Sequence, residues 1–131
     1  MKLLDTDTCI AILRGQKTVM ERRVECADSV ATTWITAGEL FYGAAKSIAP
    51  SPNRALVESF LSTLPVFGLD ATSTQIFGEA KALLEERGRR LADADLLIGA
   101  ISIALGATIV TGNRRHYERI PGVVMEDWIR D

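Results

Sequence analysis

Acidic side chains stand beside apolar stretches at separate points of the chain. Asp5 ends "LLD", Glu39 lies in "ITAGELFYGA", and Asp95 precedes the apolar run "LLI" in "LADADLLIGA". A carboxylate next to core-like residues loses hydration and needs donors or a positive partner. If these acids converge, a divalent cation removes their mutual repulsion, and carboxylate oxygens suit Mg2+ or Mn2+. Such a metal supports phosphodiester hydrolysis without a protein nucleophile.

Zinc is a poorer match to this sequence. Zinc sites normally contain histidine or cysteine ligands. The chain has one histidine, His116, and its two cysteines, Cys9 and Cys26, are far apart. A hard-cation site built from oxygen ligands is therefore the expected metal chemistry.

Each acid also has a structural interpretation. Asp7 suits a helix N-cap or an Asx turn, and Asp93 is a good N-cap. Glu39 completes a T-x-x-E capping box that begins at Thr36. Asp95 suits the positive end of a helix dipole. These interpretations explain the acids singly, but they do not explain why core-flanked acids would meet at one edge of a sheet.

The elements that would bring the acids together alternate between strand and helix. Strands are predicted at 2–5, 29–34, 66–69, 108–111 and 123–125. Helices are predicted at 8–14, 17–26, 36–46, 53–64, 71–87 and 94–105, with a loop around Pro50 and Pro52. This alternation predicts a single α/β domain over 1–131, with a parallel sheet covered by helices on both faces. Ligands of such sheets bind beyond the carboxyl ends of the strands, where Asp5 and Thr111 are expected.

The overall charge argues against a general nucleic-acid-binding surface, because the net charge is −2. The basic residues are clustered, however, in one group at 87, 89 and 90 and another at 114, 115 and 119. A solvated rim is the simpler interpretation of each group. A basic rim around an acidic centre also suits a phosphodiester substrate.

Localisation signals are lacking in this sequence. No signal peptide opens the chain, and no apolar run reaches the roughly 20 residues of a membrane span. The two separated cysteines indicate a reducing compartment. We therefore expect a cytoplasmic protein without membrane contact.

Four motifs, in this order, resemble those of the PIN-domain ribonucleases, and most closely the VapC-type toxins of bacterial toxin–antitoxin pairs. They are "LLDTD", "ITAGELFYGA", "LADADLLIGA" and "GATIVTGNRRHYERIPGVVMEDW". The resemblance extends from residue 2 to about residue 128. It implies a PIN-like three-layer α/β/α fold with a mostly parallel central sheet.

The resemblance also implies the site. The acids of the family match Asp5, Glu39 and Asp95, which would be the catalytic residues and the ligands of Mg2+ or Mn2+. Many members carry a fourth acid where this chain has Asn113, and some carry an acid at Asp93. The expected supporting residues are Thr6, Asp93, Thr111 and Asn113, and the expected contacts to substrate phosphates are Arg114 and Arg115.

The partners are likewise implied by the resemblance. They are an RNA substrate, a second copy of the chain in a homodimer, and a small antitoxin whose tail covers the acidic pocket. The antitoxin would carry the DNA-binding part, so this chain would contact DNA only indirectly. Apolar residues of the helices at 36–46 or 53–64 are the expected dimer surface.

Three alternatives remain open from the sequence. A phosphatase of the haloacid dehalogenase type would use Asp5 as nucleophile, but Cys9 replaces the expected threonine and no lysine follows Lys81. A non-catalytic receiver-like domain would use Asp70 as phosphoacceptor, and it also needs a late lysine. The third alternative is a PIN fold that has lost activity and serves as a binding module.

Overall fold

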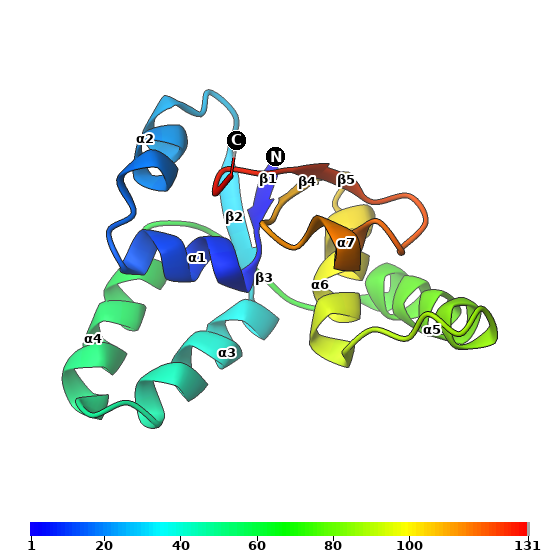
Figure 1. The fold of residues 1–131 in the computed structure, drawn as a ribbon, viewed down its shortest axis with the longest axis horizontal. Coiled ribbons are helices and arrows are strands. Elements are labelled where there is room, and N and C mark those ends of the chain that lie inside the picture. The colour runs from blue at the N-terminus through cyan, green and yellow to red at the C-terminus, as the bar shows by residue number, and fades with distance from the viewer. Residues whose placement is uncertain (131) are drawn as a thin grey trace.

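The computed structural model describes residues 1–130 and contains a five-stranded, all-parallel sheet (Figure 1). The strands are β1 (Lys2–Leu4), β2 (Val30–Thr33), β3 (Val66–Phe67), β4 (Thr108–Val110) and β5 (Val124–Glu126), in the order β3-β2-β1-β4-β5. The first four lie within their predicted ranges and are shorter, and the fifth is shifted by one residue. β1 is the central strand, so the residues after it face the middle of the carboxyl edge.

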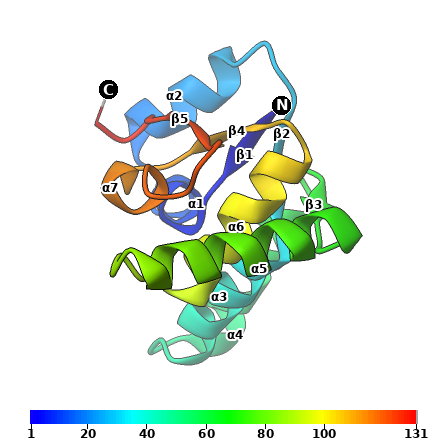
Figure 2. The ribbon, with the colours of Figure 1, turned by 90° about the vertical axis from the view of Figure 1, so that its right-hand side faces the viewer.

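Helices cover both faces of the sheet. They are α1 (Thr6–Leu13), α2 (Lys17–Glu25), α3 (Trp34–Ala45), α4 (Pro50–Leu61), α5 (Ala71–Glu86), α6 (Asp93–Ala104) and α7 (Arg114–Tyr117). In Figure 1, α1 to α4 lie on one side and α5 to α7 on the other. Figure 2 shows α5 lying across the outside of α6. The predicted three-layer α/β/α architecture is confirmed, and α7 was not predicted.

The central strand divides the core between these layers. Successive side chains of a strand point to opposite faces of the sheet. Accordingly, the fully buried Leu4 packs in a cluster with residues of α1 to α4, whereas Leu3 packs with Ile101 of α6. The "LL" before Asp5 therefore anchors the strand in both halves of the core.

The helix that carries Glu39 begins earlier than predicted. Its N-cap is Thr33, whose hydroxyl oxygen accepts from the backbone N–H of Thr36 at 3.1 Å. The chain passes from strand to helix without a loop, so one β-branched residue both ends β2 and caps α3. The predicted capping box is therefore wrong, and Glu39 lies beyond the first turn with no capping role.

The first helix also begins earlier, at the opening acid. Asp5 is the N-cap of α1, and its Oδ1 accepts from the backbone N–H of Thr8 at 2.9 Å. The expected cap, Asp7, lies instead inside the first turn. The backbone thus meets part of the hydrogen-bonding demand of this buried carboxylate.

Two further helix starts differ from prediction. Asp93 is the first residue of α6 and makes no cap, because Ala92 occupies the N-cap and the Asp93 carboxylate pairs with Lys81 at 3.0 Å. The predicted loop at Pro50 and Pro52 is wrong, since α4 begins at Pro50. Proline is tolerated in a first helical turn, where its missing N–H costs no hydrogen bond. No helix within residues 1–130 is long and apolar enough to cross a membrane.

Candidate active site

Asp5 is the buried centre of the site. It lies just beyond β1 and is 2% exposed. Burial raises its pKa to about 6, and hydrogen bonds from Thr111 and Thr8 oppose that rise. These partners are neutral hydroxyl and amide groups. A buried carboxylate stabilised only by neutral donors still favours a cation nearby.

Glu39 is tied to the start of α1. Its carboxylate is exposed, and its Oε1 accepts from the hydroxyl of Thr6 at 2.6 Å. The same hydroxyl lies 3.2 Å from Oγ1 of Thr36. Because Thr6 directly follows Asp5, this contact holds α3 beside the end of β1. The hydrogen bond expected of Thr6 is present.

Asp95 is held by two residues of α7. Its Oδ2 lies 3.2 Å from Nδ1 of His116, and its Oδ1 accepts from the hydroxyl of Tyr117 at 3.4 Å. The sequence placed His116 beside a basic cluster and gave Tyr117 no role. The available signal was the position of both residues in the segment that follows the strand β4, at the edge where Asp5 was expected.

The phenol of Tyr117 is affected by the charges of all three acids. Burial raises the pKa of its phenol, and the negative charges of Asp5, Asp95 and Glu39 raise it further. These acids come from the end of β1, from α6 and from α3. The negative charges predicted from separate motifs therefore all act on one buried phenol, and Asp95 contacts it directly.

The three carboxylates are suitable ligands for a hard cation, but the structure does not bring them together as a metal site. All three acids offer oxygen ligands, and Asp5 is a desolvated carboxylate that has no cationic hydrogen-bond partner among residues 1–130. Within residues 1–130, no three carboxylate, imidazole or thiol groups form a cluster that could hold a metal ion. Glu39 and Asp95 are instead engaged by Thr6 and His116.

Thr111 and Asn113 extend the site on the β4 side. The hydroxyl oxygen of the fully buried Thr111 accepts from the backbone N–H of Asn113 at 2.8 Å. The Asn113 amide then donates to Oδ2 of Asp7 at 3.1 Å. Asn113 thus bridges the segment after β4 to the first turn of α1.

Asp93 lies apart from the three acids. Its carboxylate faces α5, where it pairs with Lys81. It also lines a separate pocket with Arg90. The ion pair gives Asp93 a structural task, and its supporting role in the site stays a prediction.

The two basic clusters meet in space. Arg114 and Arg115 are exposed on α7, next to His116. Two residues beyond the end of α7, the guanidinium of Arg119 donates to the carbonyl oxygen of Arg90 at 3.2 Å. The loop before α6 and the segment after β4 therefore form one basic rim beside Asp95.

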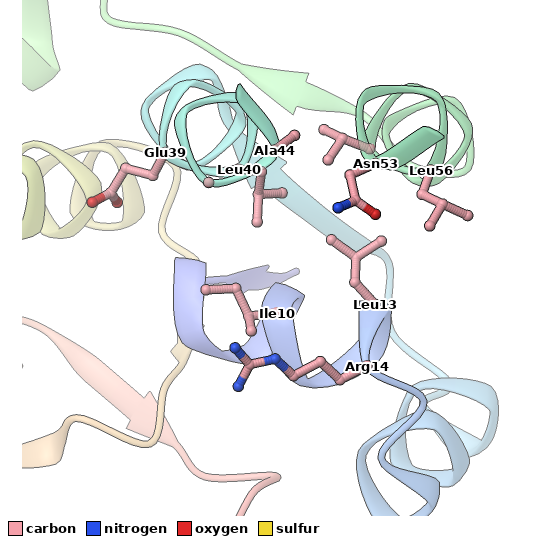
Figure 3. Close-up of a pocket in the computed structure, with 10 residues that line it drawn as sticks. Ile10, Leu13, Arg14, Glu39, Leu40, Ala44, Asn53 and Leu56 are labelled. Carbon is pink, nitrogen blue, oxygen red and sulfur yellow. The ribbon is translucent and has the colours of Figure 1, made fainter. Parts of the chain in front are cut away.

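An apolar groove runs from Glu39 along α1. Its volume is about 290 Å³. Figure 3 shows Glu39 at one end, Leu56 toward the other, and side chains of α1 facing those of α3 and α4. Its apolar lining residues are Ile10, Leu13, Leu40, Ala44, Leu56 and Val57. The groove is therefore acidic at the Glu39 end and apolar along the rest of its length.

Asp70 has a structural role instead of the one a receiver-like domain requires. It caps α5 in a capping box with Ser73, and hydrogen bonds from Ser73 lower its pKa. It follows β3, which lies at the edge of the sheet. Asp70 is therefore far in the strand order from the buried acid beyond β1.

Comparisons with known proteins show the family of this chain. The PIN domain family model matches residues 2–122. A protein of Salmonella typhimurium named tRNA(fMet)-specific endonuclease VapC is 37% identical over 127 residues, which cover 96% of each chain. Ribonuclease VapC2 of Rickettsia felis is 32% identical over 129 residues and also covers 96% of each chain.

Solved structures give the same result. The chain superposes on the DNA-bound VapBC complex of Salmonella typhimurium with a TM-score of 0.91 and 37% identity, covering 97% of both chains. For VapBC2 of Rickettsia felis, bound to a promoter DNA fragment, the TM-score is 0.89 and the identity 31%, covering 97% of this chain and 98% of that one. These findings do not favour the phosphatase, receiver or binding-module alternatives. The chain belongs to the PIN-domain family, as a VapC-type ribonuclease toxin of a VapBC toxin–antitoxin pair.

Proposed function

We propose that this ribonuclease hydrolyses RNA phosphodiester bonds with Mg2+ or Mn2+ held by Asp5, Asp95 and Glu39. The observation that carries the proposal is the buried, desolvated Asp5 at the end of the central strand, with Glu39 held beside it through Thr6. When bound, the cation would lower the pKa of an attacking water and neutralise charge on the phosphoryl oxygens. The one-metal and two-metal forms differ in their need for a fourth acid, and the amide of Asn113 favours the one-metal form.

The chain's own residues prepare this site. The Thr8 amide and the Thr111 side chain fix the Asp5 carboxylate, which cannot rotate freely in the core. His116 and Tyr117 orient Asp95, and Thr6 holds Glu39. Orientation of ligands by neighbouring hydrogen bonds tunes metal affinity and activity. Glu39, the exposed member, either binds the metal or positions the attacking water.

Arg114 and Arg115 are proposed to contact substrate phosphates. Both are exposed on α7, next to the residues that hold Asp95. Arginine suits a phosphate because its planar donors match two phosphate oxygens at once. An RNA strand entering across this rim would place its backbone over the acids.

The antitoxin is proposed to occupy the groove in Figure 3. Apolar side chains of its tail would pack against Leu40, Leu56 and Val57, and a basic side chain would reach Glu39. Such a segment would block the acids by occupying their entrance. The Salmonella and Rickettsia complexes contain both proteins and DNA, which supports an indirect contact of this chain with DNA through its antitoxin.

A homodimer is also proposed. The exposed apolar side chains Trp34 and Tyr42 of α3 supply a surface for it. Sedimentation equilibrium of antitoxin-free protein tests the dimer, with a Trp34→Ser, Tyr42→Ser variant expected to be monomeric.

Two free cysteines, Cys9 and Cys26, fit a reducing cytoplasm, where RNA targets are found.

The activity is tested by cleavage of a panel of folded RNAs with antitoxin-free protein. Initiator tRNA is included because the Salmonella relative is named for it. Reactions contain Mg2+, Mn2+ or a chelator. We expect discrete cuts that require the metal. Cuts that persist in chelator would contradict the metal site, and intact RNA throughout, at enzyme excess, would contradict the proposed activity.

A further inference from the structure

A second pocket lies against α1, next to the acids. It has a volume of about 220 Å³. One wall is a face of α1 with Asp7, Ile10, Ala11 and Arg14, and the remaining lining residues are Gln16, Gly112, Asn113, Ile129 and Arg130. Ile10 and Arg14 also line the groove of Figure 3, so the two cavities meet along the same ridge of α1.

The lining of this pocket is positively charged, on a chain whose net charge is −2. Arg14 and Arg130 are both exposed, and neither forms an ion pair within residues 1–130. Among residues 1–130, Asp7 is the one acid that lines the pocket, and its Oδ2 already accepts from Asn113. The guanidinium groups are therefore available to a ligand from solvent.

The pocket is joined to the acids through short contacts. Thr111 hydrogen-bonds both Asp5 and the backbone of Asn113, and Asn113 reaches Asp7 at the pocket wall. From Asp7, Arg14 lies two turns further along α1, about 10 Å along the helix axis. A ligand that extends from Asp5 across Asn113 thus enters the pocket within a short distance.

We infer that this pocket binds a backbone phosphate of the RNA strand, next to the phosphodiester held at the acids, through Arg14 and Arg130. The inference rests on the proposed function and extends it to the path of the substrate. Paired arginines suit phosphate, and phosphate contacts fix the register of a strand. Asn113 fits this role because its neutral amide separates the acids from the pocket, whereas a carboxylate there would repel the incoming phosphate.

With the basic rim of α7, the pocket gives the substrate two anchors, which adjoin where Asn113 of the pocket precedes Arg114 of α7. Arg114 and Arg115 lie on the α7 side, and Arg14 and Arg130 lie on the α1 side. Two anchors define the direction in which a strand crosses Asp5. Loss of the α1 anchor should weaken binding without changing the chemistry of the acids.

The test measures RNA binding in chelator, where nothing is cleaved. The probe is fluorescein-labelled initiator tRNA, titrated over a series of salt concentrations. The variants are Arg14→Ala, Arg130→Ala and the double change, with Lys17→Ala as the control, because Lys17 is an exposed cation outside this pocket. Leu56→Ala serves as a control for the groove. Circular dichroism checks that each variant is folded.

We expect each arginine variant to bind about 5- to 10-fold more weakly, and the double variant about 50-fold more weakly. The slope of log affinity against log salt should fall by roughly 0.7 per lost phosphate contact. Lys17→Ala and Leu56→Ala should bind as wild type, and Arg14→Lys should retain part of the affinity. Wild-type affinity and salt slope in the double variant would overturn the inference. So would a loss of antitoxin binding with RNA binding unchanged, since the pocket would then be a protein contact.

The same proteins separate this inference from the proposed function. Asp5→Asn should retain RNA binding in chelator and lose metal-dependent cleavage. If the wild type cleaves RNA and the arginine variants bind RNA as tightly as the wild type, the role of the pocket is wrong and the proposed activity stands. If the wild type does not cleave RNA but the arginine variants bind RNA more weakly than the wild type, the proposed activity is wrong and the role of the pocket stands.

Discussion

Oδ2 of Asp95 lies 3.2 Å from Nδ1 of His116, and this contact joins the first turn of α6 to the short helix α7. Tyr117, the next residue, donates to the other oxygen of the same carboxylate. Both oxygens of Asp95 are therefore occupied by neighbours that set its orientation. The position of one proposed metal ligand depends on four residues of helix that follow β4.

Substitution of His116 tests this dependence. His116→Ala removes the contact to Oδ2, so we expect a 10- to 100-fold loss of cleavage, with a raised Mg2+ requirement. His116→Gln, which retains a donor, should recover part of both. The measurement is the cleavage rate as a function of Mg2+ concentration. An unchanged metal dependence in His116→Ala would show that Asp95 needs no such orientation.

Asp5→Asn is expected to stabilise the metal-free protein. Burial raises the Asp5 pKa from 3.8 to about 6, so the ionised form is less favourable in the folded chain than in the unfolded chain. Above pH 6 the charge therefore lowers stability, and at about 1.4 kcal/mol per pKa unit the neutral variant should gain about 1–3 kcal/mol at pH 8. The cause is desolvation, whereas the sequence had suggested repulsion among the acids.

Urea unfolding at pH 8 in chelator measures this gain. Asp7→Asn is the matched control, because Asp7 is exposed and its removal should change the free energy of unfolding by less than about 0.5 kcal/mol. A destabilised Asp5→Asn protein would mean that the helix cap outweighs the cost of burial.

Glu126 predicts a different pH dependence. It pairs with Lys2 at 2.6 Å and Arg22 at 3.4 Å, and it accepts from the Trp128 indole at 3.1 Å. The hydrogen bond from Lys2 is the main cause that lowers the Glu126 pKa. Because the pKa of Glu126 is lower in the folded chain than its ordinary value of 4.5, its ionised carboxylate stabilises the fold above pH 4.5. This stabilisation is lost as the pH falls through the pKa that Glu126 has in the folded chain.

Glu126→Gln should therefore cost about 1 kcal/mol at pH 7 and much less at pH 3. Urea unfolding of the variant and wild type at both pH values measures the difference. Equal losses at pH 7 and pH 3 would mean that the charge of Glu126 contributes nothing and that only its packing matters.

The groove predicts how the antitoxin can be detached from the toxin. Leu56 is 58% exposed and lines the groove, so Leu56→Asp should leave the fold intact. It should weaken antitoxin binding by about 10-fold or more, because a charge replaces an apolar contact. The free variant should cleave RNA as wild type does.

Val24→Asp is the control for that change. Val24 is 85% exposed on α2 and does not line the groove. Isothermal titration with the cognate antitoxin compares the two variants. Equal affinities for Leu56→Asp and wild type would place the antitoxin elsewhere on the surface.

The sequence predicts the layers of this fold because its apolar and turn patterns are local. "LLD" followed by a helical pattern is sufficient to predict a buried strand that ends at Asp5. The helix starts were harder to predict, since Thr33 and Thr36 both suit a cap and only the strand pairing decides between them. Asp5 and Asp7 posed the same choice at α1.

The site was predicted in part for a similar reason. Asp5, Glu39 and Asp95 stand in motifs that can be found in the sequence, and their joint role in one site stays a prediction. The contacts of His116 and Tyr117 with Asp95 depend on α7, a helix too short to give a helical pattern of apolar residues in the sequence. The pocket between Arg14 and Arg130 joins residues from near the two ends of the chain, and no local pattern relates them.

The most direct test of the active site is cleavage of one RNA from the panel by Asp5→Asn, Asp95→Asn and Asp93→Asn in Mg2+. Asp93 provides the matched control, because it lies two residues from Asp95 but pairs with Lys81. We expect Asp5→Asn and Asp95→Asn to lose at least 100-fold in rate while remaining folded, and Asp93→Asn to lose less than about 10-fold. Wild-type rates in Asp5→Asn or Asp95→Asn would contradict the assignment of these acids to the metal.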